Sequence, residues 1–253
     1  MRRREFIEVA ASALAAGALV GCTSREARDD ASSPVAGARK PMNAAAFHAA
    51  RQFAETPFGR IAYVERGTGD AALFLHGFPL NGFQWRGALD RLSAHRRCVA
   101  PDFLAMGYTE VAEGQSVAPE AQAAMLVALL DSLSIPSVDL VANDSGGTVA
   151  QLFVTQHPER VRTLLLTNCD AENDSPPPAL LPVIEPALKR STVPTRIVWG
   201  TGDTIFSPAS PDYLDRTFGS SRGVRRVEGA KLFFPEEFPD LIAEEARGLW
   251  GVG

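Results

Sequence analysis

A sharp turn that could carry a nucleophile is predicted at residues 141–147, which read VANDSGG. The stretch follows a short apolar run and opens a helix-like segment, and strand-to-helix turns of this kind expose a reactive side chain. Either the carboxylate of Asp144 or the hydroxyl of Ser145 could attack there. An Asp nucleophile forms an ester with a substrate carbon, which suits epoxide opening or halide displacement. Alternatively, Asp144 only caps the helix, a role that Asp often fills.

Small residues around the turn favour Asp144 over its neighbour as the nucleophile. Strand and helix backbones crowd at such a turn, so small residues are needed on both sides of the attacking one. With Asp144 attacking, the small positions hold Ala142, Gly146 and Gly147. With the following serine attacking, the first small position would hold an asparagine. The sequence therefore predicts that Asp144 is the nucleophile.

Other polar groups also follow predicted strands. They are the residues HGFP after the run AALFL, Asp170 after RTLLLTNC and Asp203 after RIVWGTG. In open parallel sheets, functional sites form at the carboxyl ends of the strands. We therefore expect these groups to lie at one edge of a sheet together with Asp144.

Strand and helix patterns alternate from about residue 51 to the end of the chain. A hairpin is predicted around residues 57–59, and segments such as PEAQAAMLVALLDSL and PEEFPDLIAEEARGLW have the apolar spacing of helices. Such alternation implies a mostly parallel sheet covered by helices on both faces. The sequence therefore predicts one three-layer α/β domain over residues 51–253.

The order of these motifs resembles the α/β-hydrolase fold. A hairpin, a strand with HGFP, a strand with NDSGG and a helix, and a strand with GTGD match it over residues 51–253. HGFP together with an Asp at the turn is most similar to the epoxide hydrolase and haloalkane dehalogenase group. The resemblance implies hydrolysis of a small apolar substrate through an ester on Asp144, without a cofactor.

The resemblance also implies roles for the residues around the nucleophile. The backbone N–H groups of Phe78 and Ser145 would form an oxyanion hole that stabilises developing charge. Further residues are expected to shape the loop and the turn: His76, Gly77, Pro79, Gly146 and Gly147.

Hydrolysis of the ester needs a base that activates water, usually a His steadied by an acid. Asp203 is the expected acid, and Asp170 is the alternative. The resemblance places the His after the last strand, but residues 228–237 read EGAKLFFPEE, with Leu232 or Lys231 in its place. We therefore expect turnover to be weak.

On sequence grounds, none of the histidines in the chain is well placed to be this base, and His76 is the least unfavourable of them. The four histidines lie elsewhere in the chain: His48, His76, His95 and His157. Lys231 or Glu228 could substitute, but a Lys acts as a base only when its pKa is strongly lowered.

The interval that holds a helical cap in similar proteins is short in this chain. Residues 171–194 are expected to form a vestigial cap with one helix at most, broken by Pro182 and Pro186. The side chains with which full caps polarise an epoxide oxygen or bind halide are therefore expected to be missing. Phe78 also stands where dehalogenases often have an Asn that binds halide. We expect an open and wet cleft.

Composition excludes some classes of function. The net charge is -5 and both signs are spread along the chain, so no basic surface for nucleic acid is expected. No metal-ligand spacing and no glycine-rich loop of the dinucleotide type occur, so no metal or cofactor is predicted. Cys98 and Cys169 each lie beside an apolar run, which favours buried free thiols over a disulfide.

The N-terminal segment reads as a targeting signal rather than as part of the domain. Residues 1–22 have a basic start, an apolar Ala-rich run and the ending LVGC. Residues 3–7, RREFI, resemble the twin-arginine export pattern, and the ending resembles a lipobox with Cys22 as the lipidated residue. Residues 23–50 are expected to form a flexible tether. The sequence thus predicts an exported lipoprotein, anchored in a membrane of the cell envelope.

Two functions fit these observations. The first is a lipid-anchored hydrolase that acts through Asp144 on an epoxide, haloalkane or ester. The second is a non-catalytic protein that binds a small ligand or an envelope partner, as the missing His and short cap suggest. In the second, the run from Leu232 to Phe234 could form an exposed apolar patch rather than core. The sequence does not indicate an oligomeric state.

Overall fold

The computed structural model describes residues 41–171 and 180–253. The predicted leader, Cys22 and most of the tether lie outside these residues, as do residues 172–179 of the expected cap segment. The strands are β1 (Arg51–Thr56), β2 (Gly59–Arg66), β3 (Ala71–Leu75), β4 (Arg97–Pro101), β5 (Val138–Asp144), β6 (Val161–Cys169), β7 (Thr195–Gly200) and β8 (Ser221–Val227). The helices are α1 (Ala44–Ala49), α2 (Arg86–Leu92), α3 (Pro119–Ser132), α4 (Ser145–Gln156), α5 (Leu180–Arg190), α6 (Ser210–Thr217), α7 (Phe234–Glu237) and α8 (Pro239–Trp250), with 3-10 turns η1 (Gly82–Trp85) and η2 (Pro158–Arg160).

The strands form one sheet in the order β1-β2-β4-β3-β5-β6-β7-β8. β1 and β2 make the predicted hairpin, β2 pairs antiparallel with β4, and the remaining pairs are parallel. The chain passes from β3 to β4 on one side and then returns to β5 on the other. The order of the strands therefore reverses between β3 and β5, and in open α/β sheets ligands bind beyond the carboxyl ends of the strands at such a reversal.

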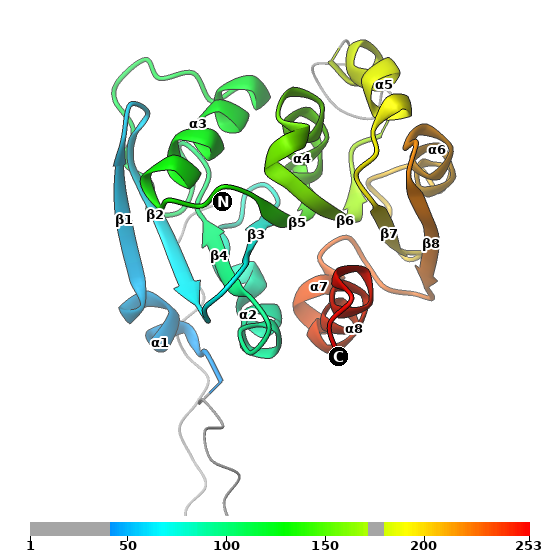
Figure 1. The fold of residues 1–253 in the computed structure, drawn as a ribbon. Helices are drawn as coiled ribbons and strands as arrows, with labels where there is room; N and C mark the ends of the chain where they lie inside the picture. The colour runs from blue at the N-terminus through cyan, green and yellow to red at the C-terminus, as the bar shows by residue number, and fades with distance from the viewer. Residues whose placement is uncertain (1–40, 172–179) are drawn as a thin grey trace, which may run out of the picture. The chain divides into compact units, whose positions relative to one another are not determined.

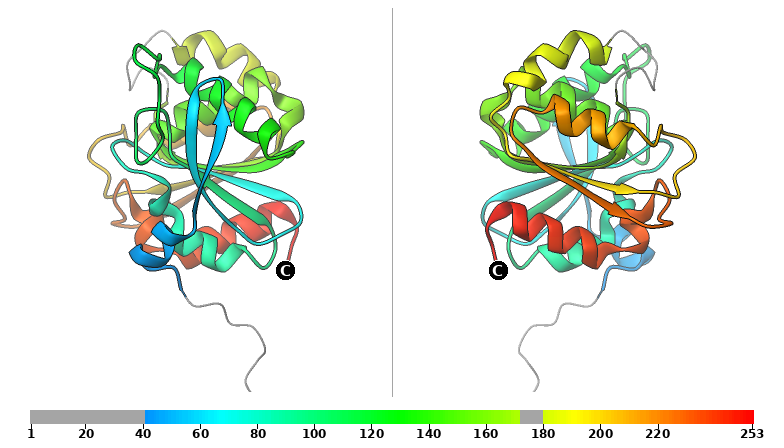
Figure 2. Two further views of the ribbon diagram at one scale, coloured as in Figure 1. Left: turned by 90° about the vertical axis from the view of Figure 1, so that its left-hand side faces the viewer. Right: turned by 90° about the vertical axis from the view of Figure 1, so that its right-hand side faces the viewer.

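Helices cover both faces of the sheet, so the predicted three-layer α/β architecture is confirmed. Figure 1 shows α3, α4, α5 and α6 above the sheet and α1, α2, α7 and α8 below it. The two side views show the same layers, with α8 beside α2 under the strands (Figure 2). Each layer has its own apolar cluster against the sheet. The sheet therefore lies between two separate cores.

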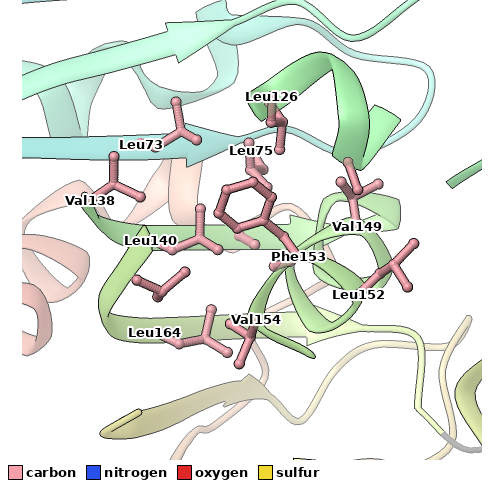
Figure 3. Packing of buried hydrophobic residues seen from close by; sticks show 14 of the residues in the cluster. Leu73, Leu75, Leu126, Val138, Leu140, Val149, Leu152, Phe153, Val154 and Leu164 are labelled. Atoms are coloured by element: carbon pink, nitrogen blue, oxygen red, sulfur yellow. The ribbon is translucent and has the colours of Figure 1, made fainter. Parts of the chain in front are cut away.

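β5 is buried on both faces because it lies at the centre of the sheet. Leu140 and Ala142 pack into the cluster under α3 and α4, whereas Val141 packs into the opposite one. Phe153 of α4 points toward Leu140 and is fully buried (Figure 3). Burial of a Phe side chain contributes about 1.5–3 kcal/mol, so this packing fixes α4 on the strand that ends at the predicted nucleophile.

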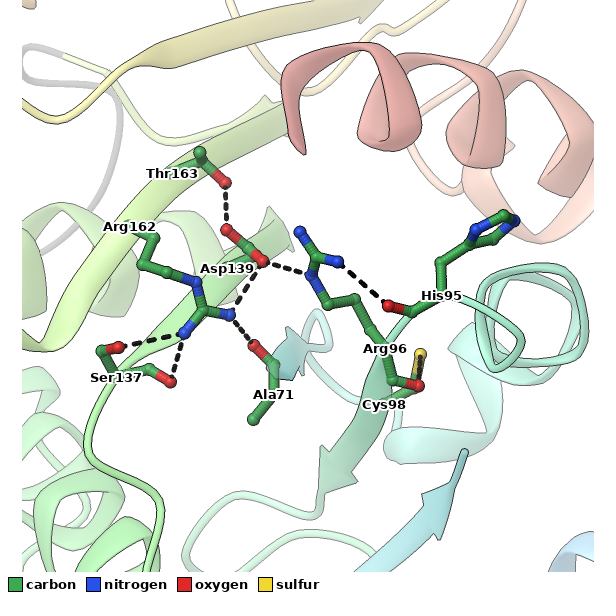
Figure 4. Close-up of polar contacts among 8 residues, drawn as sticks. All are labelled: Ala71, His95, Arg96, Cys98, Ser137, Asp139, Arg162 and Thr163. Atoms are coloured by element: carbon green, nitrogen blue, oxygen red, sulfur yellow. Dashed lines mark hydrogen bonds and ion pairs between the residues drawn. The ribbon is translucent and has the colours of Figure 1, made fainter. Parts of the chain in front are cut away.

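The opposite end of β5 is fixed by a buried carboxylate. Asp139 accepts hydrogen bonds from Arg96 Nε (2.7 Å), Arg162 Nη2 (2.8 Å) and Thr163 Oγ1 (2.9 Å) (Figure 4). Its side chain is only 2% exposed. Two guanidinium groups neutralise this charge, as a buried carboxylate requires. They tie β5 to the starts of β4 and β6, far from the turn at Asp144.

Helix α5 lies within the expected cap segment and, contrary to expectation, is not broken by its prolines. Leu180–Arg190 form one continuous helix that packs on α4 through Ile184 and Leu188, so these residues belong to the sheet-covering layer. Pro182 does not break the helix because N–H groups of the first turn have no intrahelical acceptor. Pro186 lies inside the helix, which loses one hydrogen bond there. The interval between β6 and α5 is only residues 170–179.

The N-terminal limit of the packed domain also differs from the prediction. Residues 44–49, assigned to the tether, form α1, which Asn43 caps through its side chain. Phe47 is 2% exposed and packs edge-on against Phe83, and Met42 is also buried. These two apolar side chains were the signal that the sequence interpretation missed.

Two smaller predictions are decided by burial. Cys98 and Cys169 are buried and are not joined by a disulfide, as expected, and burial raises the pKa of the Cys98 thiol well above its ordinary value. The run from Leu232 to Phe234 is not an exposed patch. Phe234 is fully buried and Leu232 packs against the core.

Candidate active site

The predicted turn is present at the end of the central strand. β5 ends at Asp144 and α4 begins at Ser145. Asp144 has φ 55° and ψ -132°, a left-handed conformation that costs a non-glycine residue about 1–3 kcal/mol. Its side chain makes no capping hydrogen bond to α4, so the interpretation of Asp144 as a helix cap is wrong. Helix capping therefore does not explain the strained conformation of Asp144.

Close packing explains the small residues around Asp144. A Cβ atom at Gly146 would lie 2.7 Å from the carbonyl oxygen of His76, and one at Gly147 would lie 2.2 Å from Cβ of Cys169. A Cβ at Gly77 would lie 2.6 Å from Cβ of Asp144 itself. Since real Cβ contacts essentially never fall below 3.0 Å, only glycine fits at these three positions.

The HGFP loop supplies a hydrogen-bond donor to Asp144, the candidate nucleophile. The backbone N–H of Phe78 donates to Oδ1 of Asp144 over 2.8 Å. Asp144 is 8% exposed, so this hydrogen bond is largely shielded from water. The other carboxylate oxygen of Asp144, Oδ2, takes no part in this bond. Ser145 is the first residue of α4, and its N–H belongs to the helix N-terminus, where donors lack intrahelical acceptors. Of the two predicted oxyanion donors, the N–H of Phe78 thus bonds to the carboxylate, and Ser145 follows Asp144 directly in the chain.

His76 is a structural residue of the loop. Its Nδ1 lies 2.9 Å from the carbonyl oxygen of Gly77, and its Nε2 accepts from the N–H of Phe103 over 3.0 Å. Burial lowers the pKa of His76, which keeps the ring neutral. Both ring nitrogens are thus engaged with the backbone, and neither is available as a base. The following Phe78–Pro79 peptide bond is cis.

The other histidines lie away from the turn. His48 is in α1 against Tyr108, and His95 precedes β4 at the opposite end of the sheet. His157 follows the C-terminus of α4, a full helix away from Asp144. None of the four can serve as the base in this arrangement.

Both candidate acids are held by side chains of the site. Asp203 Oδ2 accepts from Asn168 Nδ2 over 2.7 Å, and its Oδ1 accepts from the N–H of Ile205. Asp170 is 3% exposed and accepts from the hydroxyl of Thr148, one helical turn after the nucleophile. The structure therefore brings both carboxylates to the carboxyl edge of the sheet and leaves both assignments possible.

The loop expected to carry the base does reach the turn. The carbonyl oxygen of Leu232 accepts from Nδ2 of Asn143, the residue before the nucleophile, over 3.1 Å. Cε1 of Phe233 lies 2.8 Å from the point where a Gly77 Cβ would stand, close to Asp144. Lys231 and Glu228 are exposed. The backbone at Leu232, one of the two positions where the His was expected, therefore lies beside the turn.

Three buried amides were missed by the sequence interpretation: Gln84, Asn143 and Asn168. Their signal was present, because Asn143 and Asn168 are polar residues at the ends of apolar strands. Each side chain bonds to a segment distant in the sequence, so its role could not be assigned before the structure.

Other kinds of site are not apparent in the described part of the chain. Residues 41–171 and 180–253 contain no group of three or more His, Cys, Asp or Glu side chains arranged to hold a metal ion. Within the same ranges, no helix has the length and apolar character needed to cross a membrane.

Comparisons with known proteins agree with the fold. A model of the alpha/beta hydrolase fold family matches residues 71–190. A 2-hydroxy-6-oxo-2,4-heptadienoate hydrolase of Pseudomonas putida is 36% identical over 103 residues, which are 40% of this chain and 37% of that one. Haloalkane dehalogenase 2 of Mycobacterium bovis is 33% identical over 110 residues (44% and 38%), and epoxide hydrolase 2 of Siraitia grosvenorii is 40% identical over 101 residues (39% and 32%). The match thus covers less than two-fifths of each relative.

A solved structure extends the likeness over the whole domain. A thermophilic esterase from Thermogutta terrifontis superposes with a TM-score of 0.70 at 21% identity, covering 79% of this chain and 98% of the esterase. At this identity the likeness shows the fold alone. The chain has the α/β-hydrolase fold that its motifs predicted, with sequence relatives among dehalogenases and epoxide hydrolases.

Proposed function

We propose that this chain with the α/β-hydrolase fold uses Asp144 to attack a small apolar electrophile, such as an epoxide, a haloalkane or an activated ester. One observation carries the proposal. Asp144 is held in a strained conformation at the end of β5, bonded to the N–H of Phe78 and not to the helix that it precedes. A carboxylate placed in this way is positioned for attack rather than for capping.

The hydrogen bond from Phe78 determines which oxygen reacts. Oδ1 is held by this N–H, so Oδ2 attacks the substrate carbon. With a haloalkane, a carbon–oxygen bond forms and the halide leaves with the bonding electrons. With an epoxide, one ring carbon–oxygen bond breaks, and the resulting alkoxide takes a proton from water. The donors at Phe78 and Ser145 stabilise charge on Oδ1 when water later attacks the ester.

The second half of the reaction is slow in this proposal. Water must be deprotonated to hydrolyse the ester, and a positioned base accelerates such a step by about 10²–10⁴-fold. The stretch where the resemblance places the His has Leu232 or Lys231 instead. Both nitrogens of His76 are bonded to backbone groups. The ester on Asp144 therefore persists, and turnover is weak.

Sequence relatives support the substrate class. The printed names of two relatives are haloalkane dehalogenase 2 and epoxide hydrolase 2. The family model spans residues 71–190, which include both the HGFP loop and the turn at Asp144. The part of the chain that makes and stabilises the ester is thus the part that the family model matches.

Intact mass spectrometry tests the nucleophile directly. The domain without residues 1–22 is incubated with small epoxides, haloalkanes and activated esters. With the epoxides and haloalkanes, we expect a stable ester adduct that maps to Asp144 and is absent in D144N. With an activated ester, Oδ2 displaces the alcohol and forms an anhydride that water hydrolyses, so this reaction is followed by the released alcohol. The control D131N changes an exposed Asp at the end of α3 and keeps the adduct. Product release without an adduct would show that another residue supplies the base.

A second function follows if the mass stays unchanged and no product forms. The absence of a His from residues 228–237 favours a non-catalytic protein that binds a small apolar ligand or an envelope partner. In that case, D144N and the unmodified domain behave alike with every electrophile.

We also propose where the protein acts. The basic start and apolar run of residues 1–22 and the ending LVGC support export and lipidation at Cys22. The protein would then act at a membrane of the cell envelope, where small apolar compounds concentrate.

A further inference from the structure

A chain of buried side-chain amides runs under the proposed nucleophile. Gln84 Oε1 accepts from the N–H of Gly77 (2.9 Å), and Gln84 Nε2 donates to Asn143 Oδ1 (2.6 Å). Asn143 Nδ2 donates to the carbonyl oxygens of Asn168 (3.0 Å) and Leu232 (3.1 Å). Gln84, Asn143 and Asn168 are each at most 3% exposed.

The backbone groups to which Gln84 and Asn143 bond fix the orientation of both side-chain amides. An N–H can only donate, so the N–H of Gly77 requires the oxygen of Gln84 on its side. Carbonyl oxygens can only accept, so Leu232 and Asn168 require the nitrogen of Asn143. The two requirements meet between Gln84 and Asn143, where nitrogen faces oxygen as a hydrogen bond demands. No other assignment of the two amides satisfies every partner.

The row of hydrogen-bonded amides continues through Asn168 to Asp203, the candidate acid. Asn168 Oδ1 accepts from the N–H of Gly200 (2.6 Å), and its Nδ2 donates to the carbonyl oxygen of Gly200 (3.0 Å) and to Asp203 Oδ2 (2.7 Å). Three separate segments therefore meet at these amides: the HGFP loop, the loop at Leu232 and the loop of Asp203.

We infer that Asn143 is the positioning residue of this site, one that sets the geometry of Asp144 without touching substrate. This inference rests on the proposed function of Asp144. Asn143 is adjacent to the nucleophile in the chain, and through Gln84 it holds the peptide of Gly77, whose neighbour Phe78 donates to Asp144. It also fixes the backbone at Leu232. A shift of about 1 Å in such a group costs up to about 10²-fold in rate.

Hydrogen exchange tests the coupling without any need for reactivity. In N143A we expect faster amide exchange in both residues 76–80 and residues 230–234, because both loops lose their anchor. Q84M, which keeps the side-chain volume, should loosen only the first loop. Q122A is the matched control, since Gln122 is a buried amide bonded to Leu104 and Val117 and to neither of the two loops. If N143A leaves either loop unchanged, the inference is wrong.

Alkylation kinetics test the consequence for the nucleophile. The rate constant of adduct formation at saturating electrophile should fall about tenfold or more in N143A, with the half-saturating concentration little changed. Q122A should keep the rate constant even where it lowers stability to a similar degree. An equal loss in N143A and Q122A would mean that the amide acts only through stability. If the unmodified domain forms no adduct, the proposed function fails, and the exchange data still decide the role of Asn143.

Discussion

Leu232 lies in the loop where the base of the proposed reaction is expected. Its carbonyl oxygen is held by Asn143, so the backbone at this position is fixed beside the nucleophile even though the side chain is aliphatic. Asp203, the candidate acid, is held by Asn168 in the same network. The backbone at Leu232 and the carboxylate of Asp203 are therefore held by one network of buried amides.

Introducing a base at this position should release the stalled ester. In L232H we expect the Asp144 adduct to decay about 100-fold faster than in the unmodified domain, because a positioned base accelerates water attack. The measurement is the loss of adduct mass with time after excess electrophile is removed. L232Q, which is polar but not basic, should leave the decay slow. Equal decay in L232H and L232Q would show that the absent base is not what limits turnover.

Local and distant contacts explain which site residues could be predicted. Asp144, Gly146 and Gly147 lie within four residues, so spacing alone marks the turn. The role of Asn143 depends on partners 59 residues away at Gln84 and 89 residues away at Leu232. No local pattern encodes such pairs, and the amide chain therefore emerged only from the structure.

Helix α5 shows the limit of pattern reading for whole elements. Its prolines and its place after β6 indicated a reduced cap, yet Ile184 and Leu188 turn one side of the helix toward α4. Tertiary packing compensates for the hydrogen bond lost at Pro186. Alternation of strands and helices, by contrast, predicted the sheet correctly because buried parallel strands must be continuous apolar runs.

The buried carboxylate at the start of β5 should contribute strongly to stability but not to reactivity. D139A removes the shared partner of Arg96 and Arg162, and breaking a buried pair costs about 3–5 kcal/mol. We expect the free energy of unfolding in urea to fall by about 3 kcal/mol or more, with adduct formation at Asp144 unchanged below the transition. D212A, which breaks the exposed pair with Arg226, should cost less than about 1 kcal/mol. Similar losses in the two variants would contradict this role for Asp139.

The fold of the whole domain could be predicted from the sequence, whereas the candidate site lacks the His that the resemblance led us to expect. The reversal of strand order beside β3 places the HGFP loop next to the turn after β5 in any chain with this topology. That placement follows from the order of elements and needs no particular side chain. What fills the site afterwards is decided by single residues such as Leu232, which is why the fold was more predictable than the activity.

Location can be tested on the full-length chain. If Cys22 is lipidated after export, the mature protein begins at that residue and partitions with the membrane fraction of a bacterial host that processes lipoproteins. C22S should remove the lipid and shift most of the protein out of that fraction, because buried acyl chains contribute about 0.8 kcal/mol per CH₂ to membrane binding. Mass spectrometry of the N-terminal peptide identifies the modification. A C22S variant that stays in the membrane fraction would show that another part of the chain anchors it, and the proposed access to membrane-dissolved electrophiles would then depend on that part instead.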